Sequence, residues 1–248
     1  MSNGSKVSFW RFITQSGVNE IDIPAIQRDY VQGRRDEKIE FTLNRLLNDI
    51  SNALDTMEIL DLNYVYGKLD NKKFIPIDGQ QRLTLLLLLH IYAFAAEGKS
   101  AELKRLHCFK YNTRETTRRF LTQLIDHLPE YFEKGNDKLS SFIMDTAWFV
   151  SSWERDPSVA SFLVVLEKID NLFKNNTIAD KLMADDCPIT YMGLSINDLG
   201  NENDLYIKMN ARGKPLTEFE IFKSDLFDYA ESLVKPEHNN ILSMEFCE

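Results

Sequence analysis

The sequence predicts an α+β protein that is mostly helical by residue count, with a small mixed sheet and a large helical insertion. Two observations predict this class. Short β-favouring runs occur within the first 110 residues and again after residue 186, whereas residues 115–184 place apolar side chains at the three- to four-residue spacing of amphipathic helices. The chain has 248 residues, 44% of them hydrophobic, which suffices for one large domain or for a smaller domain that carries an insertion.

The first predicted elements are a strand, a helix and a two-stranded hairpin. Residues 20–26, EIDIPAI, carry apolar side chains at alternate positions around a proline, which predicts a short strand at an edge of the sheet. Residues 37–54 have helical spacing and predict an amphipathic helix. The β-favouring runs 62–70 and 72–77 meet at an Asp-Asn pair, so we expect them to form a hairpin.

The elements after the hairpin begin with the longest apolar run of the chain. Residues 83–96 are fewer than the ~20 that a membrane-spanning helix needs, and His90 interrupts them, so we expect a buried helix of the core. Residues 105–111 favour another strand, and residues 188–196 another. Helix, turn and helix follow within the remaining residues.

The predicted domain organisation is one compact unit. Residues 1–110 form the core with the hairpin, residues 111–185 form the helical insertion, and residues 186–248 supply a strand and helices that complete the core. The last residues stop within an apolar pattern, which indicates that the chain is the N-terminal part of a longer protein.

Charge and cysteine content narrow the classes of function. The chain has 38 acidic and 29 basic residues and a formal charge of −9, so any contact with DNA must use a local basic patch on an acidic body. Three widely spaced cysteines favour reduced thiols over a disulfide framework. The N-terminus resembles no export signal. We therefore expect a cytoplasmic protein with no membrane partner.

The most informative stretch is FIPIDGQQRLTLLLLLH, residues 74–90. A strand, a glycine turn and a helix start follow one another here, so the free N–H groups of the first helical turn form a rim that attracts anions. Gly79 lets a phosphate approach the backbone, and Arg82 offers forked donors to phosphate oxygens. Asp78 either orients Arg82 or holds a hydrated metal ion. The apolar run anchors this rim rigidly. The alternative is an ordinary Asp-Gly turn with an arginine that pairs with a carboxylate.

Two further polar clusters extend the candidate site. In IPAIQRDYVQGRRD, Gln27 and Arg28 are suited to phosphate or base edges and Tyr30 to stacking on a base, while Arg34 and Arg35 add local positive charge. KMNARGKPLT places Asn210, Arg212, Gly213 and Lys214 in a predicted turn between two helices. The alternatives are a solvated turn for the first cluster and a glycine at a helix C-terminus for the second. No Walker-type P-loop occurs, because Pro215 follows Gly213-Lys214.

Together, the segments IPAIQRDY (23–30), IDGQQRLTLL (77–86) and MNARGKPLTEFEIFKSDL (209–226) resemble the DGQQR-type domain at the N-terminus of GmrSD-like type IV restriction enzymes and related phage-defence proteins. The resemblance spans nearly the whole chain. It implies a ParB/sulfiredoxin-like fold, in which a Gly-x-x-Arg turn at a helix start grips nucleotide phosphates. Gly79-Gln80-Gln81-Arg82 matches that pattern.

The resemblance implies that a nucleoside triphosphate is bound and hydrolysed with Mg²⁺, as in a GTPase or ATPase, and that this is coupled to recognition of modified DNA. Its implied catalytic residues are Asp78, Gln81 and Arg82, with Asp78 also at the metal. The implied nucleotide-binding residues are Gln27, Arg28, Gly79, Gln80, Thr84, Asn210, Gly213 and Lys214. Those implied at DNA are Tyr30, Arg34 and Arg35.

The sequence departs from the family in two respects. Many relatives have an aromatic residue where Ile26 stands, so this chain lacks the ring on which modified-base or backbone sensing would depend. An HNH-type nuclease domain, common in full-length relatives, is missing, and no histidine has metal-ligand spacing. We expect no DNA cleavage by this chain alone and a nuclease domain or subunit as partner. The alternatives are a nucleotide-gated DNA-binding module without turnover and a non-catalytic interaction domain.

Overall fold

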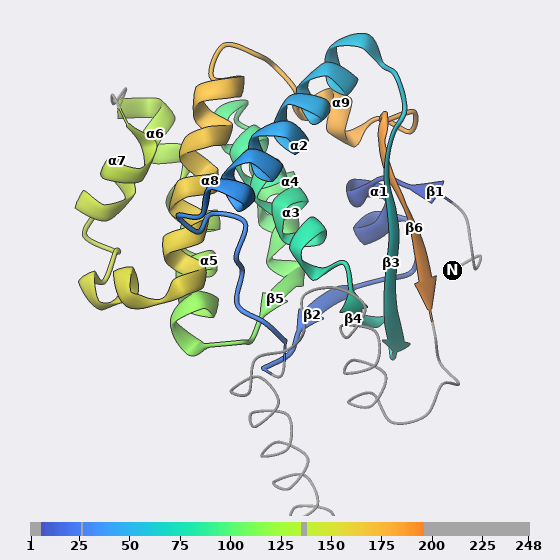
Figure 1. Ribbon diagram of the computed structural model, residues 1–248, viewed down its shortest axis with the longest axis horizontal. Coiled ribbons are helices and arrows are strands. Elements are labelled where there is room, and N and C mark those ends of the chain that lie inside the picture. Colours follow the sequence, from blue (N-terminus) through green and yellow to red (C-terminus); the bar gives the residue numbers. More distant parts are fainter. Residues whose placement is uncertain (1–5, 26, 135–137, 196–248) are drawn as a thin grey trace, which may run out of the picture. The chain divides into compact units, whose positions relative to one another are not determined.

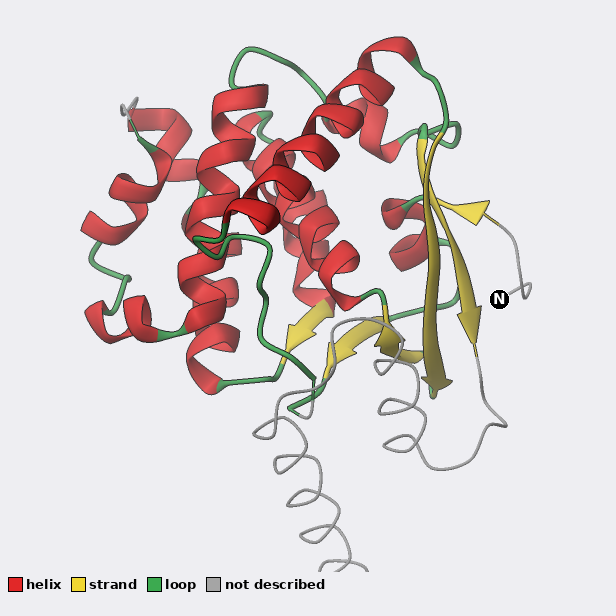
Figure 2. Cartoon of the chain, viewed as in Figure 1, coloured by secondary structure: helices red, strands yellow, loops and turns green. Residues whose placement is uncertain are grey.

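The computed structural model describes residues 6–25, 27–134 and 138–195. The chain divides into residues 1–200 and residues 201–248, and all of the described residues lie in the first of these units. Among the described residues, 56% are helical and 18% are in strands (Figure 2). The predicted fold class, α+β and mostly helical by residue count, is confirmed.

The strands form one mixed sheet in the order β1-β6-β3-β4-β2-β5 (Figure 1). Their bounds are β1 Lys6–Val7, β2 Glu20–Ile23, β3 Leu60–Asp70, β4 Lys73–Asp78, β5 Phe109–Tyr111 and β6 Ile189–Ser195. The pairs β1–β6 and β3–β4 are antiparallel, and the pairs β3–β6, β2–β4 and β2–β5 are parallel. The prediction that residues 20–26 form an edge strand is wrong, because β2 pairs on both sides and ends before Pro24.

The predicted hairpin is β3–β4. Its turn residues are Asn71 and Lys72, one position later than the predicted pair, and both have positive φ (47° and 67°), as the two-residue turns that match strand twist require. The pairing register shifts between Tyr66 and Gly67. A side chain at Gly67 would come within 2.4 Å of the Phe74 ring, which explains the glycine.

The core is organised around the helix α3 Gln80–Ala96, which confirms the predicted buried helix. Every residue from Leu83 to Ala95 is buried, and α8 Pro157–Phe173 packs along α3. The helices after β5 thus share the core of the sheet and do not form a separate body. Within the described ranges, no helix is both long and apolar enough to cross a membrane.

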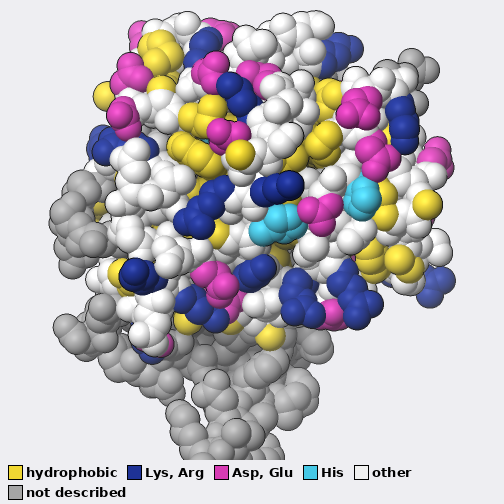
Figure 3. Space-filling view, turned by 180° about the vertical axis from the view of Figure 1, so that it is seen from behind, with side chains coloured by type: hydrophobic (Ala, Val, Ile, Leu, Met, Phe, Trp, Pro, Cys, Tyr) yellow, Lys and Arg dark blue, Asp and Glu magenta, His cyan; other side chains and the backbone are white. Residues whose placement is uncertain are grey.

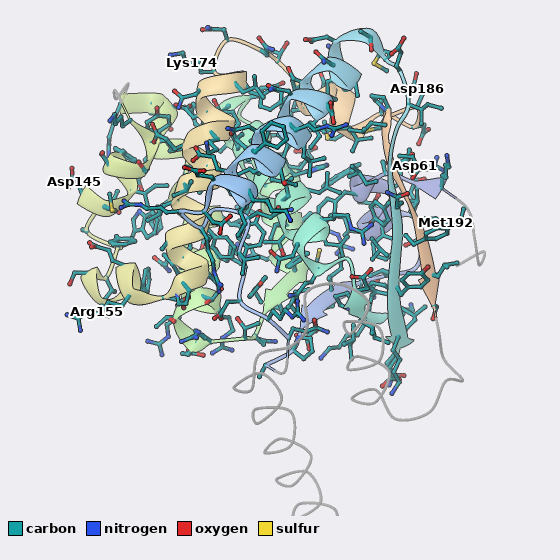
Figure 4. All side chains as sticks on the ribbon, viewed as in Figure 1. Asp61, Asp145, Arg155, Lys174, Asp186 and Met192 are labelled. Atoms are coloured by element: carbon teal, nitrogen blue, oxygen red, sulfur yellow. The ribbon has the colours of Figure 1, made fainter. Side chains whose placement is uncertain are left out.

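The remaining helices surround α3, α8 and the sheet. They are α1 Phe9–Thr14, α2 Glu37–Thr56, α4 Ser100–Arg105, α5 Glu115–His127, α6 Pro129–Lys134, α7 Leu139–Asp145 and α9 Ala179–Met183, with 3₁₀ turns η1 Leu106–Cys108 and η2 Ser151–Arg155. Charged residues at their ends, such as Asp145, Arg155 and Lys174, point outward, whereas side chains crowd the space between the elements (Figure 4).

One carboxylate joins α5 to α8. Asp156 precedes α8, and its Oδ1 accepts from the Ser158 backbone N–H at 2.9 Å, while its Oδ2 accepts from the Thr117 hydroxyl at 2.7 Å. The Thr116 hydroxyl donates to the same Oδ2. Asp156 is 4% exposed, so these donors offset the cost of burying its charge.

His90 is the ionisable residue in the middle of α3. Its ring centroid lies 4.8 Å from that of Phe9 and 5.5 Å from that of Phe94, and its Nδ1 lies 2.7 Å from the Leu86 carbonyl oxygen. Its Nε2 has no hydrogen-bond partner among the described residues. Burial lowers the pKa of His90 to about 4. The folded protein therefore holds this imidazole neutral, as expected for a histidine of the core.

We predict that His90 makes the fold acid-sensitive. A histidine in the unfolded chain binds a proton below its ordinary pKa of about 6.5, whereas His90 in the folded protein does so only near pH 4. The contribution of neutral His90 to the free energy of unfolding is therefore full above about pH 6.5 and is lost as the pH falls toward 4. The resulting decrease in the free energy of unfolding approaches about 3 kcal/mol. In urea melts across this pH range, the free energy of unfolding of His90→Leu should decrease less than that of the parent. Equal decreases in the free energy of unfolding for His90→Leu and the parent would refute the assignment.

Candidate functional site

The corner between β4 and α3 has the geometry of an anion site. Gly79 joins the two elements with φ 90° and ψ 5°, and within the described part of the chain no side-chain hydrogen bond caps the N-terminus of α3. The first helical bond runs from the Leu83 N–H to the Gly79 carbonyl oxygen. The N–H groups of the first turn and the positive end of the helix dipole are therefore not neutralised by a capping side chain.

Gly79 is required by conformation and by space. Its positive φ is unfavourable for other residues, and a side chain here would place Cβ 2.8 Å from Cγ2 of Val65 on β3. The backbone of the corner therefore lies directly on the adjacent strand. This contact fixes where α3 begins relative to the sheet.

Arg82 lies in the first turn of α3 and faces the same corner. Its Nη1 donates to the Leu62 carbonyl oxygen at 2.6 Å, and its Nη2 donates to Asp78 Oδ2 at 3.1 Å. The side chains of Arg82 and Asp78 are 25% and 47% exposed. Pairing with a carboxylate, the alternative raised by the sequence, is thus observed. A guanidinium carries more N–H donors than these two bonds use, so the pairing does not exclude an anion.

The two glutamines of the DGQQR motif bind the loop that follows β2. Gln80 Nε2 donates to the Arg28 carbonyl oxygen at 3.2 Å. Gln81 Nε2 donates to the Asp29 carbonyl oxygen at 3.1 Å, and Gln81 Oε1 accepts from the Val31 N–H at 3.0 Å. The Gln81 amide therefore donates one hydrogen bond to the loop backbone and accepts one from it, as a neighbouring strand would.

The reciprocal contact comes from Gln27, which is buried and donates from Nε2 to the Pro76 carbonyl oxygen at 2.9 Å. The QR and DGQQR motifs thus form one hydrogen-bonded unit. Because both ends of its amide are engaged, we assign Gln81 to positioning the loop and not to the predicted catalytic role. Thr84, whose implied role is nucleotide binding, is 0% exposed and donates to the Gln80 carbonyl oxygen of its own helix at 2.8 Å.

Gln80 retains an unused acceptor. Its side chain is 7% exposed, and its Oε1 is buried without a hydrogen-bond partner among the described residues. An unsatisfied buried acceptor costs about 1–3 kcal/mol, so a water or a ligand donor is expected at this atom. A hydroxyl group or a metal-bound water would satisfy it.

Tyr64 and Tyr66 are site residues that the sequence analysis missed. Both lie on β3, their ring centroids are 5.7 Å apart, and their planes differ by 20°. Tyr66 pairs directly with Asp78 across the hairpin, so the two side chains point to the same face of the sheet. Tyr64 is 45% exposed. Aromatic residues at alternate positions of the strand before the motif were the signal available.

Of the three predicted DNA contacts, one is buried and two line a different groove. Tyr30 is 0% exposed, its ring centroid is 5.1 Å from that of Phe162, and burial raises its pKa. Stacking on a base is not compatible with this burial, because it needs an exposed ring face. Arg34 and Arg35 are exposed beside a groove of about 670 Å³ between α2, α7 and α8. They are therefore separate from the corner at Gly79.

The remaining predicted site residues are Arg28, the three residues of the third motif and the metal ligand Asp78. Arg28 is half-buried, and its carbonyl oxygen accepts from Gln80. Asn210, Gly213 and Lys214 lie outside the described residues. Within the part of the chain that the structure describes, no three His, Cys, Asp or Glu side chains come together to hold a metal. The single carboxylate of Asp78 would be enough for Mg²⁺, because this ion often binds one or two carboxylates together with substrate phosphates.

We predict that Gly79 is needed for stability on two separate grounds. Gly79→Ala should lower the free energy of unfolding by about 2 kcal/mol or more, because strain at positive φ adds to the clash with Val65. Gly98→Ala is the matched control, since Gly98 has φ 66° and nothing within 4 Å of a Cβ. It should cost about 1 kcal/mol. Equal losses in urea melts would show that contact with Val65 is unimportant.

Comparison with known proteins assigns the chain to a family. A search of curated proteins found none that matches the chain. The family model described as "GmrSD restriction endonuclease, N-terminal domain" matches residues 10–227. This span contains β2 through β6, the DGQQR corner and all of the insertion helices. Because the match covers most of the sequence, the chain belongs to the family of GmrSD restriction endonuclease N-terminal domains.

Proposed function

We propose that the corner at Gly79 binds the phosphates of a nucleoside triphosphate and that this domain supplies the nucleotide-dependent step of a restriction or phage-defence protein. The observation that carries the proposal is the uncapped N-terminus of α3, a helix of 17 residues, beside the half-exposed pair of Arg82 and Asp78. A phosphate at this point gains backbone N–H donors, the helix dipole and a guanidinium.

Arg82 and Asp78 have different roles at the phosphates in this proposal. Arg82 is held by the Leu62 carbonyl oxygen, so its remaining donors are positioned for phosphate oxygens. Asp78 opposes an anion by its charge unless a cation lies between them. Mg²⁺, when bound, neutralises phosphate charge and so removes this repulsion. In this proposal Asp78 is the residue that makes nucleotide binding depend on the divalent cation.

Gln80 and the tyrosine pair are suited to the other end of the nucleotide. The free Oε1 of Gln80 can accept from a hydroxyl group, and the exposed face of Tyr64 can stack on a base. Stacking on Tyr64 is tolerant of base identity, since every base offers a π-face. The described residues thus favour binding of nucleoside triphosphates as a class.

A second candidate is a nucleotide-gated module without turnover. Gln81, one of the implied catalytic residues, is engaged by the Asp29 and Val31 backbone. This engagement favours binding over hydrolysis unless the loop moves. Release of inorganic phosphate at saturating nucleotide separates the two candidates, because only an NTPase yields it above the no-enzyme rate.

We predict opposite effects for the two charges of the corner. Arg82→Ala should weaken triphosphate binding by about tenfold to a hundredfold, because a charge-assisted contact is lost. Asp78→Asn should strengthen binding without Mg²⁺ and reduce the benefit of adding it. Isothermal titration with the four common nucleoside triphosphates, with and without Mg²⁺, measures both.

Arg45→Ala is the control for Arg82, because Arg45 lies on α2 and its side chain is 75% exposed. Thermal melts of each variant show whether the fold persists. Binding that is unchanged in a folded Arg82→Ala variant would remove the phosphate site. Absence of binding by the parent protein would favour the non-catalytic interaction domain.

A further inference from the structure

The strongest local concentration of positive charge runs from the end of α4 through β5 to the beginning of α5. Residues 104–119 contain six Lys or Arg and one acidic residue, in a chain whose formal charge is −9. Lys and Arg side chains gather toward the lower edge of the described surface seen in Figure 3, where Figure 1 places β5 and the start of α5. A basic face on an acidic protein indicates a polyanionic partner.

This face is hollowed into a groove of about 640 Å³ between β5 and α5. Among its lining residues are the cations Lys110, Arg118 and Arg119 and the indole rings of Trp148 and Trp153. Glu115 is the acidic residue of the lining. The charged side chains of the groove therefore carry a net positive charge even when His107, which also lines it, is neutral.

The two arginines share one carboxylate. Arg118 Nη2 lies 2.5 Å from Glu115 Oε2, and Arg119 Nε lies 2.8 Å from Glu115 Oε1. These bonds lower the pKa of Glu115, with Arg118 the larger cause, so the carboxylate stays ionised and orients both guanidiniums. The side chains are 51% and 68% exposed, and most of their N–H donors remain available.

Trp148, which lines the groove, has a hydrogen-bond donor that is unused in the described part of the chain. Its indole Nε1 is buried and has no acceptor among the described residues. The ring is held by the His127 ring, with centroids 5.7 Å apart and planes 16° apart. Indole is a donor only, so an acceptor oxygen or nitrogen from a ligand would satisfy it.

The groove beside Arg34 and Arg35 lacks this charge. Its basic lining residues, Arg34, Arg35 and Lys168, are matched in number by Glu40, Glu154 and Glu167. Lys168 is further neutralised by its contact with Glu40 at 2.8 Å. The pair predicted from the sequence to contact DNA thus lies in an electrically balanced groove.

We propose that the groove between β5 and α5 is a nucleic-acid-binding face, in which Lys110, Arg118 and Arg119 contact backbone phosphates. Two neighbouring arginines favour phosphate, because the guanidinium fork matches its oxygens. This face is built from elements other than the corner at Gly79, so the assignment does not depend on nucleotide binding there.

The test compares two double variants of the full chain that change charge equally. Arg118→Gln/Arg119→Gln should weaken binding of a fluorescent 20-base-pair duplex by about tenfold or more at low salt and reduce the slope of log affinity against log salt by about two. Arg34→Gln/Arg35→Gln, the matched control, should bind like the parent. Fluorescence anisotropy without nucleotide measures both, and thermal melts confirm that the variants fold.

Glu115→Gln tests the same face in the opposite direction. Removing the carboxylate leaves both arginines without their shared counter-charge, so affinity for the duplex should rise about threefold or more. A variant that merely loosened the helix would not gain affinity.

Three results would overturn the assignment. They are absence of duplex binding by the parent, equal losses in the two double variants, and a Glu115→Gln variant that binds no better. Polyglutamate of matched charge is the final comparison. If it competes as well as the duplex, the face is a docking site for acidic protein and not for nucleic acid.

Discussion

The organisation of this domain depends on the burial of α3. Each residue from Leu83 to Ala95 is buried against the sheet or the insertion helices, so the helix has little freedom to shift or rotate. The polar turn that precedes it is consequently held at one place on β3, where Gly79 touches Val65. A recognition site needs such rigidity, because donors placed before the ligand arrives cost no ordering free energy on binding.

The glutamines of the DGQQR motif connect this rigid corner to a loop. Gln80 and Gln81 bind the backbone of residues 28–31, and Asp29 in that loop forms two 3.1 Å bonds to Arg114 at the start of α5. A continuous chain of contacts therefore joins the corner to the basic groove. The loop therefore contacts the corner and the start of α5, which makes it the physical element through which occupation of one proposed site could alter the other.

Much of the fold was predictable, because its signals are local. The amphipathic helix over residues 37–54, the hairpin and the buried helix all follow from apolar periodicity and turn residues. The position of β2 was not predictable, because an alternating run with a proline suits an edge strand equally well. Its partners β4 and β5 come from distant parts of the chain, and only their packing places β2 between them.

The sequence by itself determined the class of the fold, the glycine corner and the family, since each is carried by contiguous residues. Tertiary structure alone decided which polar side chains are free to act. Gln81 and Tyr30 are polar or aromatic residues of a motif, yet one is engaged by a loop and the other is buried against Phe162. It also brought Tyr66 opposite Asp78 and collected the basic residues around one groove. Exposure and partners arise from contacts between residues far apart in sequence, and no local pattern records them.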